Sequence, residues 1–511
     1  MKKKKYFEFL LLITLGVLTS LSLPPYNFFL INFVTFSLFF FYIYRKKKLD
    51  NINKGFLYGW LFGFGYFLSS LYWITISLTF DANFQFLIPI ALILIPAFLS
   101  IFYGLAVFCF FFIKIKNPIA NLFLFSILFG ATEFLRGSLF TGFPWNLIIY
   151  SFVDYLEIVQ IISFTGTYAL NMLCISFFTC PIIFILKENK KDIIASILIL
   201  LSPVILFAFG TSKIKSFESL EVIQNDYVIR AIGSNIDLDR FYRNIDTESV
   251  IDDLINISKP DLEKKILFIW PEGIIPNTNQ SELVKFKLLF KENFSENHLI
   301  GMGINAYEKK EDQNFFYNSF SFYDHEVKLI DSYNKVNLVP FGEFLPLQDF
   351  LSSFGLKSLT NNYQSFTSGK SREIIFISNE KFDIKILPLI CYEVIYSGRI
   401  FNSSEFDYTI NISEDGWFGK SIGPYQHFTH SIFRAIESGK YLIRSSNNGI
   451  ASVINPIGSV EKEISFGSTG YIDFSEKKIV DTTIFSQHGN KMFLIMILLY
   501  IFLIFSFNRK L

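Results

Sequence analysis

The feature that most restricts the fold of this chain is a series of long apolar segments, which fills most of residues 1–214 and returns once at the C-terminus. A helix that crosses a bilayer needs about 20 mostly apolar residues. The composition agrees, since 51% of the 511 residues are hydrophobic and 64 are Phe. We therefore expect a polytopic α-helical membrane domain. Its eight expected spans are residues 6–22, 29–44, 56–80, 87–113, 121–137, 158–186, 193–210 and 492–507.

The basic residues next to these segments predict the orientation of the chain. With eight spans they fall mostly on one side, which the positive-inside rule makes cytoplasmic. These residues are Lys2 to Lys5, Arg45 to Lys48, Lys54, Lys114, Lys116, Lys187, Lys190, Lys191, Arg509 and Lys510, whereas Lys213, Lys215 and Lys491 flank the opposite ends. A cleavable signal peptide is the alternative for the first segment, but "LSLPPYNF" is a poor cleavage site, so we expect a retained helix.

Three parts follow from this layout: a transmembrane domain of seven helices at 1–214, an outside domain at 215–488, and a C-terminal transmembrane helix at 489–511. In a bacterium with two membranes the outside domain lies in the periplasm. The net charge of +1 gives no electrostatic reason to expect a nucleic-acid partner. The 4 cysteines contain no CxxC pair and indicate neither a zinc site nor a disulfide framework. Cys109, Cys174 and Cys180 lie in apolar stretches, and Cys391 alone lies in the polar domain.

The outside domain alternates short β-type runs with helix-like segments, which is typical of a layered α/β fold with a buried sheet. Functional residues of such folds gather at strand ends and in the loops that follow them. The runs are 227–236, 265–273, 298–307, 316–324, 382–393, 406–415 and 451–460, and helix-like segments include 281–292 and 425–440.

Three strand ends carry groups that together could perform acyl transfer. Glu272 follows the run "FIWPEG", Lys335 and Glu343 lie in "YNKVNLVPFGEFLP", and Cys391 ends "LPLICYE". A free thiol has a pKa of about 8.5 and attacks as the thiolate, so it needs a base. A carboxylate can take its proton, and an ammonium can hold the oxyanion that forms. Taken singly, each residue is more often an ordinary surface or packed residue, so the spacing alone does not decide between these interpretations.

Five motifs in order narrow the choice: "WPEG", "YNKVNLVPFGEFLP", "ICYE", "EDGWFG" and "RSSNNGIASVINPIG". Together they resemble the carbon–nitrogen hydrolase (nitrilase) superfamily and, within it, the membrane-bound apolipoprotein N-acyltransferase family. The resemblance covers about residues 220–480 and implies an α-β-β-α sandwich. It implies Glu272, Lys335 and Cys391 as catalytic residues. It also implies supporting roles for Glu343, Tyr392 and Glu393.

The resemblance also implies the substrates and the place of the reaction. The acyl donor would be a membrane phospholipid, the acceptor a diacylglyceryl apolipoprotein, and the place the bacterial inner membrane; we expect a monomer without a cofactor.

The segment "GSNIDLDRFY" (233–242) departs from the family pattern. Asn235 is present, but Ser and Leu replace the usual Gln, and Tyr242 replaces the usual Trp. The alternatives are a membrane-anchored amidase or nitrilase that uses water, and a transporter with an inactive domain. A transporter predicts buried charges in the spans, for which Glu133 and Arg136 are the candidates.

The remaining polar motifs carry weaker expectations. His298, His325, His427, His430 and His488 show no metal-ligand spacing, so we expect no metal. Asn411, Arg434, Arg444 and Asn447 lie in segments that resemble the family, and we expect them to support the sandwich. The loop "TGFPWN" (141–146) either lines an entrance for lipid or is a turn with an interfacial Trp anchor. Residues 350–370 and the loop of Glu343 are the candidates for a mobile lid, which hydrogen exchange would test.

Overall fold

The computed structural model describes residues 2–242, 245–310, 313–347, 365–400 and 405–508. Contacts divide the chain into two compact units. The helical unit comprises Met1–Ser216, Lys420–Thr429 and Thr483–Leu511, and the sheet unit comprises Phe217–Gly419 and His430–Thr482. Nothing in the sequence suggested that residues 420–429 belong with the helical unit. They include the first part of α14 (Gly423–Ser438), whose remaining residues belong to the sheet unit.

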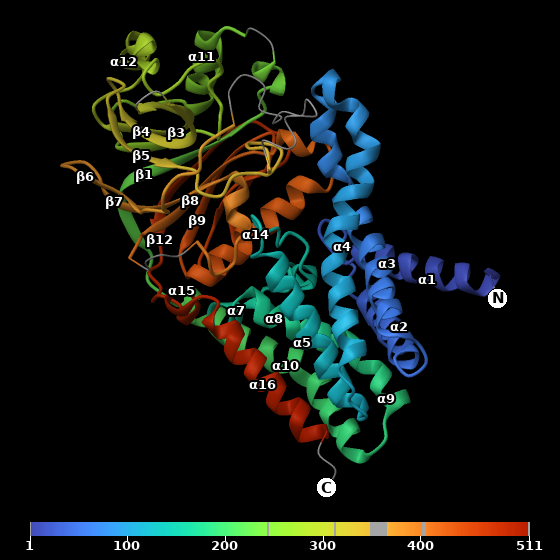
Figure 1. The fold of residues 1–511 in the computed structure, drawn as a ribbon. Coiled ribbons are helices and arrows are strands. Elements are labelled where there is room, and N and C mark those ends of the chain that lie inside the picture. The colour runs from blue at the N-terminus through green and yellow to red at the C-terminus, as the bar shows by residue number, and fades with distance from the viewer. Residues whose placement is uncertain (1, 243–244, 311–312, 348–364, 401–404, 509–511) are drawn as a thin grey trace. The chain divides into compact units, whose positions relative to one another are not determined.

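Helices that differ widely in length build the helical unit (Figure 1). The longer ones are α1 (Lys2–Ser20), α2 (Ile31–Lys46), α3 (Ile52–Leu71), α4 (Ile88–Phe112), α5 (Pro118–Arg136), α8 (Thr167–Thr179), α10 (Lys190–Glu218) and α16 (Lys491–Asn508). The shorter ones are η1 (Tyr72–Thr79), η2 (Ala82–Leu87), η3 (Ile148–Phe152), α6 (Leu156–Val159), α7 (Ile162–Thr165), η4 (Cys180–Ile182), α9 (Ile183–Leu186) and α15 (Ile484–His488).

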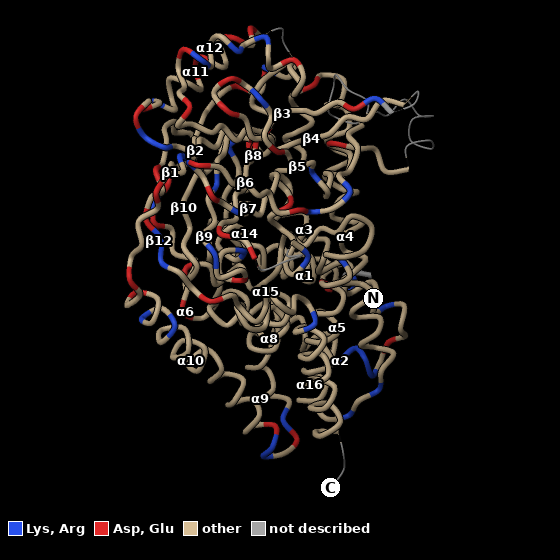
Figure 2. The backbone as a smooth tube through the Cα atoms, turned by 90° about the vertical axis from the view of Figure 1, so that its left-hand side faces the viewer, with Lys and Arg blue, Asp and Glu red and all other residues tan. Residues whose placement is uncertain are grey.

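Six helical segments among the described residues are long and apolar enough to cross a membrane. They are Ile52–Thr79, Ala82–Phe112, Pro118–Arg136, Thr167–Leu186, Lys190–Glu218 and Lys491–Asn508. The two other expected spans are also helical, but α2 has only 16 residues and α1 begins with four lysines. Lys, Arg, Asp and Glu are sparse along α10 and α16, as Figure 2 shows. The polytopic helical architecture is confirmed, with six rather than eight segments that meet the requirements of a span.

The expected span 158–186 was wrong in its first part. Gly166 has φ +78, a left-handed conformation that interrupts the chain between α7 and α8. A Cβ at this position would lie 2.0 Å from the ring of Phe485, so no larger residue fits. The continuous apolar helix therefore begins at Thr167 rather than at residue 158, because apolarity alone does not reveal a break in backbone conformation.

The buried charges of α5 form a fixed structural link. Arg136 Nε donates to Glu133 Oε2 at 2.7 Å, and the Tyr103 hydroxyl of α4 donates to Glu133 Oε1 at 2.6 Å. Arg136 also donates to the Phe143 carbonyl in the loop after α5. The charges that a transporter would need are thus used to join two helices and a loop.

That loop contains Trp145, which the sequence offered as an interfacial anchor. The interpretation as an anchor is wrong, because Trp145 is only 3% exposed. Its Nε1 donates to Gln426 Oε1 at 2.9 Å, and Trp73 Nε1 donates to the same oxygen at 3.2 Å. Gln426 thereby ties residues 420–429 to the helical unit.

The sheet unit is built on one continuous twelve-stranded sheet. Its strands are β1 (Ile223–Ser234), β2 (Ile266–Ile269), β3 (His298–Lys310), β4 (Gln313–Asp324), β5 (Leu329–Asn334), β6 (Ile375–Ser378), β7 (Asp383–Ile390), β8 (Tyr408–Glu414), β9 (Tyr441–Asn447), β10 (Ala451–Ile454), β11 (Val460–Ile464) and β12 (Gly470–Lys477). The order is β5-β4-β3-β2-β1-β9-β8-β7-β6, with β12 on β1, and with β10 between β9 and β11.

The sheet consists of two halves that meet at β1 and β9. These two strands share only two residue pairs, Gly233 with Ser446 and Ser234 with Asn447. Strands β1, β2 and β3 run parallel in one half, and β7, β8 and β9 run parallel in the other. At the far ends of the path β5 contacts β6, so the sheet nearly closes. Two facing halves of this kind confirm the expected nitrilase-like α/β architecture.

Helices cover the half of the sheet that contains β1–β3. Helices α11 (Thr247–Ser258) and α12 (Lys287–Asn293) lie beside this half (Figure 1) and bury apolar side chains against β1–β3. Trp270 belongs to the same buried core. The rest of the helical turns are η5 (Leu238–Phe241), η6 (Leu283–Phe286), η7 (Cys391–Ile395) and η8 (Asp415–Phe418). Because the carboxyl ends of parallel strands meet at one edge, η7 after β7 and the "WPEG" loop after β2 are presented where active sites of such folds form.

Candidate active site

Three of the residues that the sequence singled out form a buried ion cluster in the sheet unit. Lys335 Nζ lies 3.1 Å from Glu272 Oε1 and 2.9 Å from Glu343 Oε1. Glu272 is 7% exposed, Glu343 7% and Lys335 1%. Two carboxylates against one ammonium leave one negative charge, so the cluster keeps a carboxylate that can accept a proton.

Local structure explains why these side chains converge. Glu272 follows β2, and a Cβ at Gly303 on the neighbouring β3 would lie 2.4 Å from its Cα, so only glycine allows this approach. Lys335 directly follows β5, and its N–H donates to the Asn318 carbonyl of β4 at 2.8 Å. The Glu343 carboxylate is held by its own loop, where Oε2 accepts from the Val339 N–H at 2.8 Å.

Asn318 joins the two carboxylates and was missed by sequence reasoning. Its Nδ2 donates to Glu272 Oε1 at 2.8 Å and to Glu343 Oε1 at 2.7 Å. The side chain is buried on β4, within a run that reads as an ordinary alternating strand. The role of Asn318 becomes visible only from its position opposite the loops of Glu272 and Glu343, and the sequence does not show that position.

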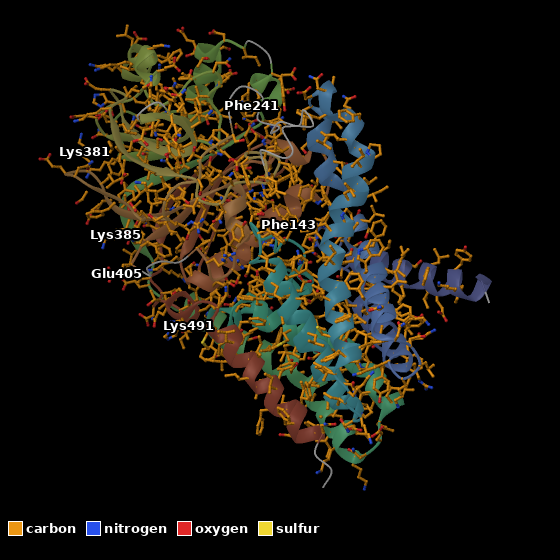
Figure 3. The ribbon with its side chains drawn as sticks, viewed as in Figure 1. Phe143, Phe241, Lys381, Lys385, Glu405 and Lys491 are labelled. Atoms are coloured by element: carbon orange, nitrogen blue, oxygen red, sulfur yellow. The ribbon has the colours of Figure 1, made fainter. Side chains whose placement is uncertain are left out.

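Cys391 is presented by a strained turn at the end of β7. This strand begins at the surface, where Lys385 is exposed (Figure 3), and its residues 386–390 are buried. Cys391 itself has φ +48, a conformation that costs a non-glycine residue about 1–3 kcal/mol and often marks functional sites.

The site keeps the Cys391 thiol protonated at rest. Burial, followed by the neighbouring Glu272 carboxylate, raises the pKa of the thiol well above its usual value, although Lys335 and a hydrogen bond with Ser413 oppose this. Burial also opposes the charge of Lys335, but the Glu272 and Glu343 carboxylates outweigh it and raise the pKa of the ammonium. Glu272 and Lys335 therefore both act on the thiol, one as a potential base and one as a fixed positive charge.

Glu393 holds the turn of Cys391 and the loop of Lys335 together. Its Oε2 accepts from the Ile390 N–H at 2.9 Å, and its Oε1 accepts from the N–H groups of Val336 and Asn337 at 2.9 and 3.1 Å. Arg372 Nη2 donates to the same Oε1 at 2.7 Å. Burial opposes the Glu393 charge, but Arg372 and these amides outweigh it and lower the pKa of the carboxyl.

A second buried network lies behind the nucleophile. Asn411 Nδ2 donates to the Leu389 carbonyl at 3.1 Å, and its Oδ1 accepts from Arg444. Arg444 Nη2 pairs with Asp415 at 2.8 Å, and the Ser413 hydroxyl donates to Asp415 Oδ1 at 2.6 Å. These contacts fix the end of β7 against β8 and β9.

The segment that departs from the family pattern lies beside an aromatic group. Phe241 (Figure 3) stacks on Trp417 with ring centroids 5.4 Å apart. Tyr242 approaches Trp417 edge-on at 6.4 Å, and Asn235 is exposed. Tyr242 thus provides an aromatic ring that contacts Trp417 of the motif "EDGWFG".

Tyr392 and the end of the candidate lid segment are among the described residues, whereas most of the lid segment is not. Tyr392 is buried and its ring meets that of Tyr396 edge-on at 5.5 Å. Of the candidate lid, residues 350–364 lie outside the described residues. The Phe366 N–H donates to the Glu343 carbonyl and the Gly369 N–H to the Lys335 carbonyl, each at 2.8 Å, so the end of this segment is bonded to the ion cluster's loops.

Comparisons with known proteins match both units. A model of the apolipoprotein N-acyltransferase N-terminal domain matches residues 15–180, and a carbon–nitrogen hydrolase model matches residues 265–475. An apolipoprotein N-acyltransferase of Rickettsia prowazekii is 34% identical over 487 residues, which cover 93% of each chain. The chain belongs to the apolipoprotein N-acyltransferase family.

Further relatives agree with this membership. The apolipoprotein N-acyltransferase of Rickettsia typhi is 33% identical over 96% of this chain and 95% of its own. That of Rhizobium leguminosarum bv. trifolii is 31% identical over 91% of this chain and 89% of its own. The protein is thus a bacterial membrane protein and an acyltransferase with a carbon–nitrogen hydrolase domain.

Two solved structures are similar to about half of the chain. An amidase from Nesterenkonia sp. is 12% identical and covers 50% of this chain and 93% of its own, with a TM-score of 0.33. A nitrilase-superfamily protein from Saccharomyces cerevisiae is 16% identical and covers 50% of this chain and 91% of its own, with a TM-score of 0.34.

Proposed function

We propose that this protein transfers a fatty acyl chain from a membrane phospholipid to the N-terminal α-amine of a diacylglyceryl-cysteine on apolipoproteins. The proposal combines the family membership with one observation, the buried cluster of Glu272, Lys335 and Glu343, in which the charges of Glu272 and Lys335 act on the thiol of Cys391. The expected location is the bacterial inner membrane, with the sheet unit in the periplasm and the protein as a monomer.

The first step forms a thioester. Because the thiol is protonated at rest, Glu272 takes its proton as Cys391 Sγ attacks the ester carbonyl of the phospholipid. Lys335 and backbone N–H groups near residue 392 stabilise the negative oxygen of the tetrahedral intermediate. The lysophospholipid leaves with the proton that Glu272 returns, and the acyl group remains on sulfur.

The second step consumes the thioester. The α-amine of the acceptor attacks the thioester carbonyl while Glu272 takes a proton from the nitrogen, so an amide forms and the thiol is regenerated. An amine displaces a thiolate readily, and the two half-reactions predict ping-pong kinetics. Asn318 Nδ2 donates to Glu272 Oε1, and Glu343 Oε1 accepts from Lys335 Nζ, so we assign both residues to orienting Glu272 and Lys335 rather than to proton transfer.

Hydrolysis by the same residues, as in an amidase, is the alternative. Water would then replace the amine in the second step and release a free fatty acid. The long apolar helices favour the transferase, since one helix is enough to anchor a hydrolase.

Intact-mass analysis tests the proposal. Wild-type protein, Cys391→Ala and the control Cys109→Ala are incubated with a phospholipid of one acyl type and no acceptor. We expect a mass increase of one acyl group on the wild type and on Cys109→Ala, and none on Cys391→Ala. Addition of a lipopeptide with a free amine should remove this acyl group and form the lipopeptide amide. An active preparation without any adduct would contradict the thioester, and release as free fatty acid in the presence of the amine would favour the amidase.

A further inference from the structure

The helical unit contains a buried lysine that has no carboxylate partner among the described residues. Lys47 follows α2 and is only 6% exposed. Its Nζ donates to Asn121 Oδ1 at 2.8 Å and lies 4.0 Å from the centre of the Phe110 ring. A buried ammonium costs several kcal/mol unless a negative charge compensates it. The neutral amide and the ring supply only part of that compensation.

Two acidic residues at this end of the unit, Asp50 and Asp192, already have other partners. Asp50 accepts from Lys54 at 2.6 Å. Asp192 Oδ1 accepts from Asn117 Nδ2 at 2.8 Å, and its Oδ2 accepts from the Glu188 N–H at 2.9 Å. Neither carboxylate is therefore placed to neutralise Lys47.

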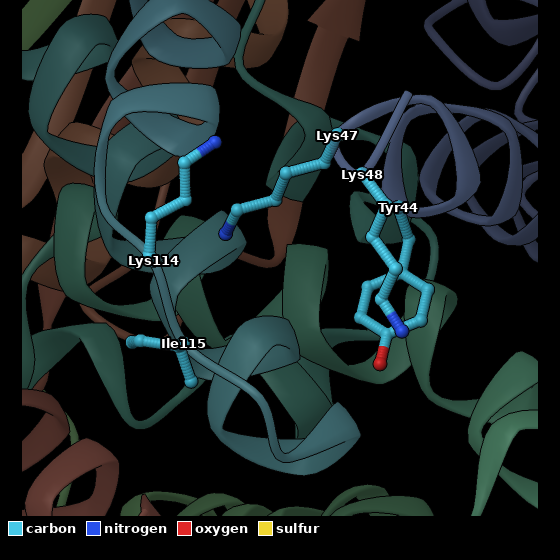
Figure 4. A pocket seen from close by; sticks show the side chains of 5 residues that line it. All are labelled: Tyr44, Lys47, Lys48, Lys114 and Ile115. Atoms are coloured by element: carbon cyan, nitrogen blue, oxygen red, sulfur yellow. The ribbon is translucent and has the colours of Figure 1, made fainter. Parts of the chain in front are cut away.

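The ammonium of Lys47 faces an open hollow with a second positive charge. The hollow has a volume of about 300 Å³, at the lower end of the range of ligand pockets, and is lined by Tyr44, Lys47, Lys48, Lys114 and Ile115. Figure 4 shows the amino groups of Lys47 and Lys114 in the same part of this hollow. Burial and the charge of Lys114 lower the pKa of Lys47 to about 7, the shift that an anion in the hollow would reverse.

An apolar hollow lies at the same end of the helical unit. It has a volume of about 250 Å³ and is lined by Asn53, Phe56, Leu105 and Phe108 of α3 and α4. Both hollows lie where α2 ends, α3 begins and α4 ends. A basic pocket at the ends of apolar helices is the usual setting for the head group of an anionic lipid, and nearby apolar surface suits its acyl chains.

We propose that the hollow formed by Tyr44, Lys47, Lys48, Lys114 and Ile115 binds the phosphate of an anionic phospholipid, with Lys47 and Lys114 as its counter-charges. The site contains none of the residues proposed for acyl transfer and does not rest on that function. One N–H of the Lys47 ammonium donates to Asn121 Oδ1, which fixes the position of the ammonium. The other two N–H groups can donate to phosphate oxygens.

Native mass spectrometry of the delipidated full-length protein in micelles tests this site. Short-chain phosphatidylglycerol, phosphatidylcholine and inorganic phosphate are titrated separately against wild type, Lys47→Gln/Lys114→Gln and a control, Lys187→Gln/Lys191→Gln. The control removes two exposed lysines, Lys187 directly after α9 and Lys191 in the first turn of α10. At about 1 kcal/mol per lysine near the charged lipid, the site variant should bind phosphatidylglycerol about 30-fold more weakly, and the control should match the wild type.

Each other result would overturn the proposal. Equal binding by wild type and site variant, equal losses in both double variants, or equal affinity for phosphatidylcholine would each exclude a specific anionic-lipid site. Inorganic phosphate bound as tightly as phosphatidylglycerol would show a free-anion site instead. Lys114 is exposed, so Lys114→Gln alone cannot disturb the core and should show a smaller loss of phosphatidylglycerol binding even if the double variant folds poorly.

Discussion

Lys335 and Lys47 are two almost completely buried lysines with opposite electrostatic surroundings. Lys335 lies between the carboxylates of Glu272 and Glu343, which raise its pKa. Lys47 has an amide, an aromatic ring and a second lysine as neighbours, and its pKa falls to about 7. Burial is common to both, so the difference comes from the partner charges alone. In the two proposals made above, Lys335 is a permanent cation for the acyl transfer, and Lys47 acquires its counter-charge from a bound lipid.

Replacement of each lysine by Met should give the largest contrast. Lys335→Met leaves two buried carboxylates without a counter-charge, which should lower the free energy of unfolding by about 3–5 kcal/mol. It should also slow acyl-enzyme formation about 10²–10³-fold through loss of the oxyanion contact. Lys47→Met removes an uncompensated charge and should change the free energy of unfolding by about 1 kcal/mol or less. Unfolding in micelles and intact-mass kinetics measure these effects, and equal destabilisation by the two variants would refute the contrast.

Glu393→Gln should have the next largest effect, because it weakens the link between the Cys391 turn and the Lys335 loop. We expect a loss of about 2–3 kcal/mol in the free energy of unfolding, since hydrogen bonds to a charged group are lost around Arg372. Acyl-enzyme formation should slow as well, because both reacting groups lose their common support. The control is Glu373→Gln, an exposed carboxylate bonded only to Ser371 in the described structure, which should resemble the wild type. A normal rate in Glu393→Gln would show that the link does not position the site.

Asn318→Leu tests the smaller contribution of the amide that joins the two carboxylates. The two lost hydrogen bonds, each worth about 1.5–3 kcal/mol to a charged group, predict an acylation rate about 10–100-fold lower. Asn314→Leu, on the same strand but exposed, is the matched control. A reduced rate in both variants would point to general damage to β4.

The pH dependence of stability should show the smallest effect and distinguishes the two lysines directly. Between about pH 7 and 10.4 the unfolded chain keeps a proton on residue 47 that the folded protein has released. The free energy of unfolding should therefore rise with pH in this window, by at most about 1.4 kcal/mol per unit. Lys47→Gln should lack that rise, and saturating phosphatidylglycerol should suppress it in the wild type.

Lys335 should contribute no slope in the same window. Its folded pKa is raised, so it stays protonated in both states and its stabilisation is lost only above the unfolded pKa of about 10.4. After burial, Lys114 is the charged neighbour that lowers the pKa of Lys47 further. Thermal melts of wild type and Lys47→Gln across pH 7–10 measure the difference, and parallel curves would contradict the assignment.

Much of the architecture could be predicted because it depends on local patterns. Apolar length predicts the helices of the helical unit, and alternating runs predict most strands of the sheet unit. The motifs located Glu272, Lys335, Glu343 and Cys391, and the structure brings the first three into contact. The break at Gly166 and the burial of Trp145 were not predicted, because each depends on a segment distant in the sequence: Phe485 in one case and Gln426 in the other.

The sequence by itself therefore determined the class of the protein and its family, and it singled out the residues proposed to react, since apolar length and motif order are properties of neighbouring residues. Only the tertiary structure decided which charges are compensated. Asn318 bridges two carboxylates, Glu393 joins two loops, and Lys47 is buried without an acidic partner among the described residues. The physical reason is that the energy of a buried polar group depends on its partners in space, and those partners come from segments that the chain brings together only when it folds.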